Sequence, residues 1–192
     1  MQNSETYAPK SPAEWRQWLL ENHLSKSSVW LVLYKKSSDK HNMAWSEAVD
    51  EALCFGWVDG RRRPMDGERF LQFFCRRKPN STWSKINKDK VADLVTRMRM
   101  MPAGFDCINI AKQNGSWNIL DDVENLVLPD DLRLALEQQT GALEYYMLLS
   151  PSVKKLILQW VKLCKTDLTR KGRITEIVNA ASVQMLPPAL RR

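Results

Sequence analysis

The chain has 192 residues, of which 44% are hydrophobic and 27% are charged. This length and composition exclude a largely disordered protein and predict one compact domain or two small packed subdomains. No stretch approaches the roughly 20 consecutive apolar residues that span a bilayer. The polar segment 1–10 also lacks the apolar core of a secretory signal. We therefore expect a cytoplasmic protein without membrane insertion.

The charge and the cysteine pattern narrow the expected partners. A net charge of +7 favours anionic partners, without separating nucleic acid, acidic protein and small anions. Neither histidine lies at metal-ligand spacing from a cysteine, and the cysteines form no C-x-x-C pair. We expect free thiols, no metal site and no cofactor. The four cysteines are Cys54, Cys75, Cys107 and Cys164.

The first predicted elements alternate helix and strand. A Ser-Pro-Ala-Glu run from Ser11 is typical of a capped helix start, and the helix is expected over 12–23. An unbroken run of apolar β-formers predicts a buried strand over 29–36. Apolar residues at four-residue spacing then predict an amphipathic helix over 45–55, which Gly56 ends.

A β-hairpin is expected next, with strands at 57–62 and 69–77 joined by a Pro-Met-Asp-Gly turn. From Ser81 the apolar period changes to 3.6, which predicts that the rest of the chain is helical. The predicted fold class is α+β, with a small, mainly antiparallel sheet. We expect an α+β part over 1–80 and a helical part over 81–192, packed as one unit.

Several motifs carry a family resemblance. They include Ala-Leu-Cys-Phe-Gly-Trp-Val-Asp-Gly at 52–60, Trp-Ser-Lys-Ile-Asn at 83–87, Pro-Ala-Gly at 102–104 and Ser-Pro-Ser at 150–152. Together they resemble the YdeI/OmpD-associated family, also called bacteriocin-protection proteins, over residues 11–181. The resemblance implies a helical C-terminal module and a role in bacteriocin or antimicrobial-peptide tolerance. It implies no defined reaction.

One hairpin cluster is the main candidate site. Alternate residues of a strand share a face, so an indole, a carboxylate and guanidinium groups are expected to meet across the hairpin. Such groups suit an anionic small molecule or an acidic partner, because guanidinium groups bind carboxylate or phosphate through paired hydrogen bonds. The predicted ligand-binding residues are Trp57, Asp59, Arg61, Arg69 and Arg76.

Two other interpretations of that cluster stay open. An Asp–Arg salt bridge with Trp57 in the core would make the cluster structural. Alternatively, Asp59 would be the acid or base of an enzyme, which requires a concave site and a second reactive group. We favour a non-enzymatic protein.

Basic clusters support a nucleic-acid-binding alternative. Residues 61–78 hold seven Arg or Lys against two acids, and residues 154–173 hold seven against one. Grooves that combine such charges with aromatic side chains bind single strands, although no recognisable RNA or DNA motif is present. The residues assigned to this alternative are Arg62, Arg63, Arg77, Lys78, Arg170 and Arg173.

Two polar runs are interpreted as helix starts. Ser84 next to Lys85 is a poor catalytic pair, because close neighbours along a helix do not face each other. Ser84 is better interpreted as a helix cap, and Thr166 likewise. Ala44 stands where related chains often place a Ser or Thr cap, which is expected to cost about 1 kcal/mol of stability.

Overall fold

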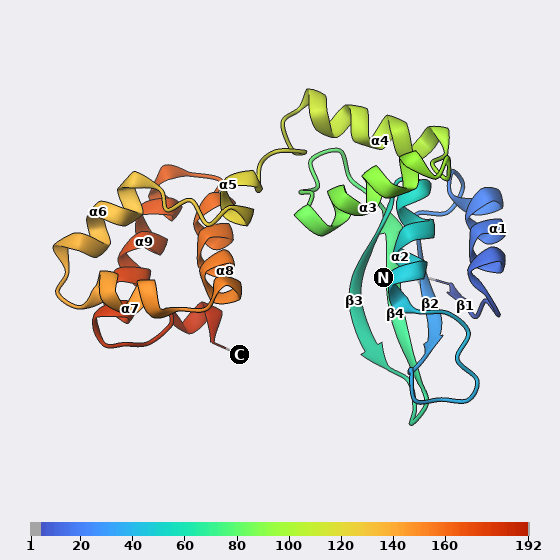
Figure 1. The fold of residues 1–192 in the computed structure, drawn as a ribbon, viewed down its shortest axis with the longest axis horizontal. Helices are drawn as coiled ribbons and strands as arrows, with labels where there is room; N and C mark the ends of the chain where they lie inside the picture. The colour runs from blue at the N-terminus through green and yellow to red at the C-terminus, as the bar shows by residue number, and fades with distance from the viewer. Residues whose placement is uncertain (1–4, 192) are drawn as a thin grey trace. The chain divides into compact units, whose positions relative to one another are not determined.

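A computed structural model describes residues 5–191 of the chain (Figure 1). It divides into two compact units, Met1–Trp117 and Asn118–Arg192, each with its own hydrophobic cluster. The division differs from the boundary expected between residues 80 and 81. Val91, Leu94 and Ile108 belong to the core cluster of the first unit. The change of period at residue 81 therefore marks the passage from strands to helices, and the first core continues beyond it.

The first unit contains a four-stranded sheet in the order β1-β2-β4-β3 (Figure 1). β2 pairs antiparallel with β4, and β4 with β3, whereas β1 runs parallel to β2. The α+β class and the mainly antiparallel pairing are as the sequence predicts. β1, only two residues long, was not predicted, because a two-residue strand has no periodicity to detect. The strands are β1 (Thr6–Tyr7), β2 (Ser28–Tyr34), β3 (Trp57–Pro64) and β4 (Arg69–Arg76).

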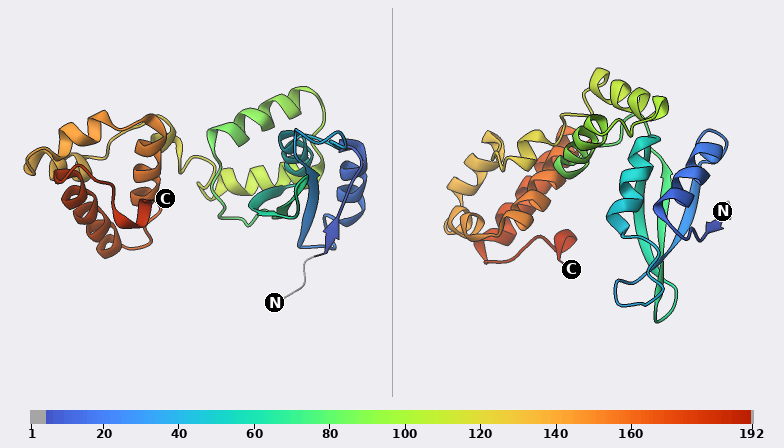
Figure 2. Two further views of the ribbon diagram at one scale, coloured as in Figure 1. Left: turned by 90° about the horizontal axis from the view of Figure 1, so that it is seen from below. Right: turned by 45° about the vertical axis from the view of Figure 1, so that its right-hand side comes forward.

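Four helices complete the first unit, and α1 and α2 lie over one face of the sheet (Figure 2). That face is apolar because every second residue of β2 points to it, including Val29, Leu31 and Leu33, all fully buried. Ser84 caps α3 by accepting a hydrogen bond from the backbone N–H of Asn87, as expected. The helices are α1 (Pro12–Asn22), α2 (Trp45–Cys54), α3 (Lys85–Thr96) and α4 (Pro102–Gln113).

The start of α4 lies directly against the end of α2. Gly56 has a φ of +70°, and a Cβ there would lie 2.9 Å from the carbonyl oxygen of Ala103. A Cβ on Gly104 would lie 2.4 Å from the carbonyl oxygen of Cys54. The backbone N–H of Met101 donates to that same oxygen at 3.0 Å. Gly56, in the motif at 52–60, and Gly104, in the motif at 102–104, thus permit backbone-to-backbone contact between these helices.

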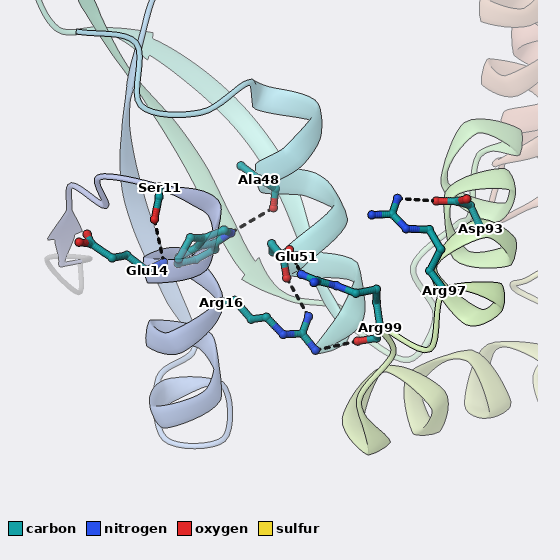
Figure 3. A network of polar contacts seen from close by, with 9 residues as sticks. Ser11, Glu14, Arg16, Ala48, Glu51, Asp93, Arg97 and Arg99 are labelled. Carbon is teal, nitrogen blue, oxygen red and sulfur yellow. Dashed lines mark hydrogen bonds and ion pairs between the residues drawn. The ribbon is translucent and has the colours of Figure 1, made fainter.

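A buried carboxylate links α1, α2 and the segment before α4 (Figure 3). Glu51 is 7% exposed and forms ion pairs with Arg16, at 2.8 Å, and with Arg99. Arg16 also donates to the backbone carbonyl oxygen of Arg99 at 2.8 Å. Because the carboxylate and both arginines take part in these contacts, the cluster fixes α1, α2 and the segment before α4 relative to one another.

The second unit is helical throughout its regular structure. Its core is formed by apolar side chains such as Leu132, Leu136, Ile157 and Ile177, each no more than 1% exposed. Thr166 caps α9 through the backbone N–H of Thr169, as expected. No helix within residues 5–191 is both long and apolar enough to cross a bilayer. The helices are α5 (Asp121–Glu124), α6 (Asp130–Gln138), α7 (Ala142–Leu148), α8 (Pro151–Lys162), α9 (Asp167–Ser182) and the 3-10 turn η1 (Pro188–Leu190).

Candidate functional site

The hairpin β3–β4 forms as predicted, but it contains a bulge. Trp57, Val58 and Asp59 face Arg76, Cys75 and Phe74 in that order, and the register then shifts before Arg62 reaches Gln72. An extra residue in one strand reverses the alternation of faces beyond it. Arg62, and not Arg61, therefore shares the face of Trp57 and Asp59.

The structure does not bring the five predicted ligand-binding residues together. The Trp57 side chain is fully buried, and its indole N–H points to the carbonyl oxygen of His23 at 3.4 Å. Arg61 lies on the opposite face of the sheet, with its guanidinium 5.5 Å from the ring centroid of Trp30. The expected arrangement assumed unbroken alternation along β3, which the bulge removes.

The other two arginines lie at opposite ends of β4. Arg69 is the first residue of β4, next to the hairpin turn, and its Nε donates to Asp66 at 2.7 Å. Arg76 is exposed at the far end, and its Nη1 is 3.4 Å from the carbonyl oxygen of Leu24. The structural interpretation is thus correct in placing Trp57 in the core. The Asp–Arg pair of the hairpin joins Asp66 to Arg69 and does not involve Asp59.

Asp59 is half-buried on the same face as Trp57. Burial is the main influence on its carboxyl group and raises the pKa above its ordinary value. A hydrogen bond from the Trp45 side chain and the positive charges of Arg77 and Arg62 oppose that rise. None of these three groups is a general base at neutral pH.

A large cleft lies next to this face. Its volume is about 860 Å³, and it is enclosed by the end of β2, the loop after it, the start of α2 and the outer half of the hairpin. No acidic side chain is among its lining residues, whereas four basic or imidazole side chains are. The lining residues are Tyr34, Lys35, Lys36, His41, Ala44, Trp45, Ser46, Arg62, Pro64 and Phe70.

Arg62 is the best-positioned cation of this cleft. Its guanidinium carbon lies 4.1 Å from the ring centroid of Phe70, and its Nε is 3.4 Å from the side-chain oxygen of Gln72. Gln72 is held in turn by donating to the carbonyl oxygen of Gly60 at 2.7 Å. No carboxylate among residues 5–191 forms an ion pair with Arg62. A guanidinium supported on one face and without an ion-pair partner suits an anion.

The start of α2 provides a second favourable feature. Ala44 offers no side-chain cap, and Trp45 beside it is 44% exposed at the cleft. The positive end of a helix favours anions, and an exposed indole offers a flat surface for a ring. Glu47 accepts a hydrogen bond from the backbone N–H of Ala44 at 2.7 Å and offsets part of that positive end. The arrangement can accept a molecule that carries both a negative group and a flat apolar part.

Within the first unit, the residues of the nucleic-acid alternative do not share one face. Arg63 lies over Trp30, at 4.8 Å from its ring centroid, on the face opposite to the cleft. Arg77 is buried, and Lys78 is exposed. In the second unit Arg170 is paired with Asp131, and Arg173 donates to the carbonyl oxygen of Trp160 and lies over its ring.

Sequence reasoning missed most of the cleft. Tyr34, Lys36, His41 and Trp45 lie within one short stretch of the chain, but no motif there predicts that this stretch folds beside Arg62. One signal was present: Gly60 within a predicted strand is typical of a bulge, and a bulge would have exchanged Arg61 for Arg62. No cluster of His, Cys, Asp and Glu within the described residues has the arrangement of a metal site. The four cysteines are free.

Comparisons with known families match both units. Residues 7–107 match a domain of unknown function (DUF8412), which covers more than half of the chain. Residues 125–182 match the family described as bacteriocin-protection, YdeI or OmpD-associated. The chain therefore belongs to the family of that domain of unknown function, and its helical second unit carries the bacteriocin-protection, YdeI or OmpD-associated domain.

The family resemblance seen in the sequence is thus confirmed by the match in the second unit. The motifs at 52–60, 83–87 and 102–104 lie within the other matched domain. Searches among curated proteins and among solved structures gave no match.

Proposed function

We propose that this protein is a non-enzymatic binding protein for an anionic small molecule with a flat ring, which occupies the cleft around Arg62. One observation carries the proposal: the Arg62 guanidinium, which has no ion-pair partner among the described residues, lies on Phe70 at the wall of a cleft of about 860 Å³ that no acidic side chain lines. The exposed Trp45 would contact the ring, and Arg62 would hold the anionic group.

The biological role that we propose is a cytoplasmic one in stress or in tolerance to bacteriocins or antimicrobial peptides. The support for this role is the description of the family matched by the second unit. Ligand binding at the cleft of the first unit would then be part of that role.

Phenyl phosphate is a suitable probe of the cleft, because it combines an anion and a ring. We expect it to raise the melting temperature of the full chain more than inorganic phosphate and phenol together do at the same concentrations. An equal or smaller effect would contradict a site that uses both features. Calorimetric titration then gives the affinity of each probe.

Arg61 and Arg62 provide a matched pair of variants, because they are adjacent in sequence and lie on opposite faces of the sheet. Arg62→Gln should weaken phenyl phosphate binding about tenfold or more, the loss typical of a charge-assisted hydrogen bond. Arg61→Gln should leave the affinity unchanged. An equal loss in both variants would indicate a general charge effect and would contradict this site.

Nucleic-acid binding is a second candidate, favoured by Arg61 and Arg63 on the face opposite to the cleft. Both guanidinium groups lie over the Trp30 ring. Arginines and aromatic rings on one sheet face suit single-stranded nucleic acid. A fluorescent oligonucleotide should bind at about 50 mM salt and dissociate as salt rises. Absence of binding at that salt concentration would eliminate this candidate.

A further inference from the structure

Arg77, also in the first unit, is a buried basic residue without an anionic partner. It is only 8% exposed, and its backbone N–H donates to the carbonyl oxygen of Gly56 at 2.9 Å. Its Nη1 donates to the carbonyl oxygen of Thr82 at 2.8 Å. Its Nε and Nη2 are buried and make no hydrogen bond. A buried cation with unpaired donors costs free energy unless an acceptor reaches it.

A second buried donor without a partner lies beside Arg77. Its guanidinium carbon lies 3.8 Å from the ring centroid of Trp83, whose indole Nε1 is also buried without a partner. Burial is the main influence on Arg77 and lowers its pKa; nearby Cys107, Asp59 and Cys75 act in the opposite direction. No carboxylate of the described residues lies within ion-pair distance of Arg77.

The two unpaired nitrogens define one recognition edge. In a guanidinium group the Nε–H and Nη2–H bonds are parallel and lie on the same edge, which matches the two oxygens of a carboxylate. This chain shows the geometry in its second unit. There Nε and Nη2 of Arg170 donate to the two carboxylate oxygens of Asp131 at 2.7 and 2.8 Å.

Arg77 also lines a hollow of about 250 Å³, separate from the cleft around Arg62. A water molecule occupies about 30 Å³ in the liquid, so this hollow has room for a molecule of several heavy atoms. Much of its lining is apolar, which suits a short hydrocarbon chain. The apolar lining includes Leu24, Phe55, Ala103 and Ile110, and the charged or polar lining includes Arg76, Arg77, Asp106 and His23.

We propose that this hollow binds a short-chain carboxylate, whose two oxygens accept hydrogen bonds from Nε–H and Nη2–H of Arg77. The hydrocarbon part lies against Leu24 and Ile110. Nε and Nη2 are buried in the hollow, so the ligand reaches them only when side chains of the lining move, and Leu24 and Arg76 are exposed side chains of that lining. The site shares no lining residue with the cleft around Arg62 and does not depend on the function proposed for that cleft.

Butyrate is the probe that tests the site. The full chain is labelled with ¹⁵N-arginine, and its spectrum is compared with those of Arg77→Met and Arg77→Lys. The Nε–H resonance that both variants lack belongs to Arg77. That resonance should move with saturation as sodium butyrate replaces sodium chloride at constant ionic strength, and the Arg170 resonance should not. A non-saturating shift, or none, would overturn the proposal and would indicate that water alone satisfies this edge.

Variants separate this site from the other cleft. Arg77→Lys keeps the charge but removes the paired donors, and should weaken butyrate binding about tenfold or more in calorimetry. Arg62→Gln should leave butyrate binding unchanged. Equal loss in the two variants would overturn the assignment. Inorganic phosphate should compete weakly, because the apolar lining contributes nothing to its binding; tighter binding of phosphate than of butyrate would contradict a carboxylate site.

Discussion

At the scale of single residues, neighbouring side chains of one type have different roles because their surroundings differ. Arg61, Arg62 and Arg77 belong to one basic cluster in the sequence. Arg61 lies over Trp30 on one face of the sheet, Arg62 lines a cleft on the other face, and Arg77 is buried beside Trp83. Charge alone therefore does not predict what an arginine binds; its partners and its burial do.

Asp59 leads to a prediction about pH. Its pKa is raised in the folded protein, so the folded state binds this proton more tightly than the unfolded chain. The stability contributed by this proton is present below the unfolded value of 3.8 and is lost as pH rises through the folded pKa. Asp59→Asn should therefore raise the free energy of unfolding at pH 7, by an amount reduced by solvent screening because the carboxyl group is only half-buried. Urea unfolding should show a smaller gain at pH 4; an equal gain at both values would contradict this account.

Glu51 leads to a prediction about stability. Glu51→Gln leaves Arg16 and Arg99 without their shared carboxylate and should lower the free energy of unfolding by about 2 kcal/mol. Arg97→Gln is the control, because its ion pair with Asp93 is exposed, and should cost less than about 0.5 kcal/mol. Similar unfolding midpoints in guanidinium for the two variants would show that the buried cluster contributes no more than a surface pair.

At the scale of elements, close backbone contacts decide how α2 packs against α4, and a missing side-chain cap affects the start of α2. The hairpin bulge rotates half of β3, and glycines at the junction of α2 and α4 permit the backbones to touch. These features act through geometry rather than through hydrophobic area.

The α2–α4 contact predicts a large effect of one methyl group. Gly104→Ala would place a Cβ 2.4 Å from the carbonyl oxygen of Cys54 and should lower the free energy of unfolding by about 3 kcal/mol. Gly172→Ala lies in α9 with nothing within 4 Å of its Cβ and should stabilise by about 0.5–1 kcal/mol. Thermal and urea unfolding check both signs. Equal effects would mean that α4 can shift without cost.

The uncapped start of α2 predicts a conflict between stability and binding. Ala44→Ser and Ala44→Asp should each raise the free energy of unfolding by about 1 kcal/mol, because each supplies the missing side-chain acceptor. Only Ala44→Asp should weaken phenyl phosphate binding, since it adds a negative charge to the lining of the cleft. Unchanged affinity in Ala44→Asp would argue against an anion near this helix start.

At the scale of the whole molecule, the chain contains two hydrophobic clusters that share no residue. A compact region with its own core can fold alone. Each of the two fragments, 1–117 and 118–192, should therefore show helical circular dichroism and a cooperative melt. Dispersed amide resonances in both fragments would agree with this, and a fragment that stays unfolded would show that its unit requires the other.

Local patterns predicted most elements. Ser11, Ser84 and Thr166 were correctly interpreted as caps, and β2, β3, β4, α1 and α2 begin and end within a few residues of their expected positions. These features depend on neighbouring residues, whose capping and periodicity are visible in one stretch of chain. β1 and the short helices α5 and α7 were missed, because short elements carry too little pattern.

The sequence by itself thus determined the fold class, the order of the main elements and the family matched by the second unit, since each depends on local patterns or on motifs. The tertiary structure alone decided which side chains meet. A single bulge exchanged Arg61 for Arg62 at the cleft, and the packing of α4 against Gly56 placed Arg77 beside a hollow. The physical reason is that contacts between distant segments depend on register and close packing, and one residue of shift in a strand reverses every face beyond it.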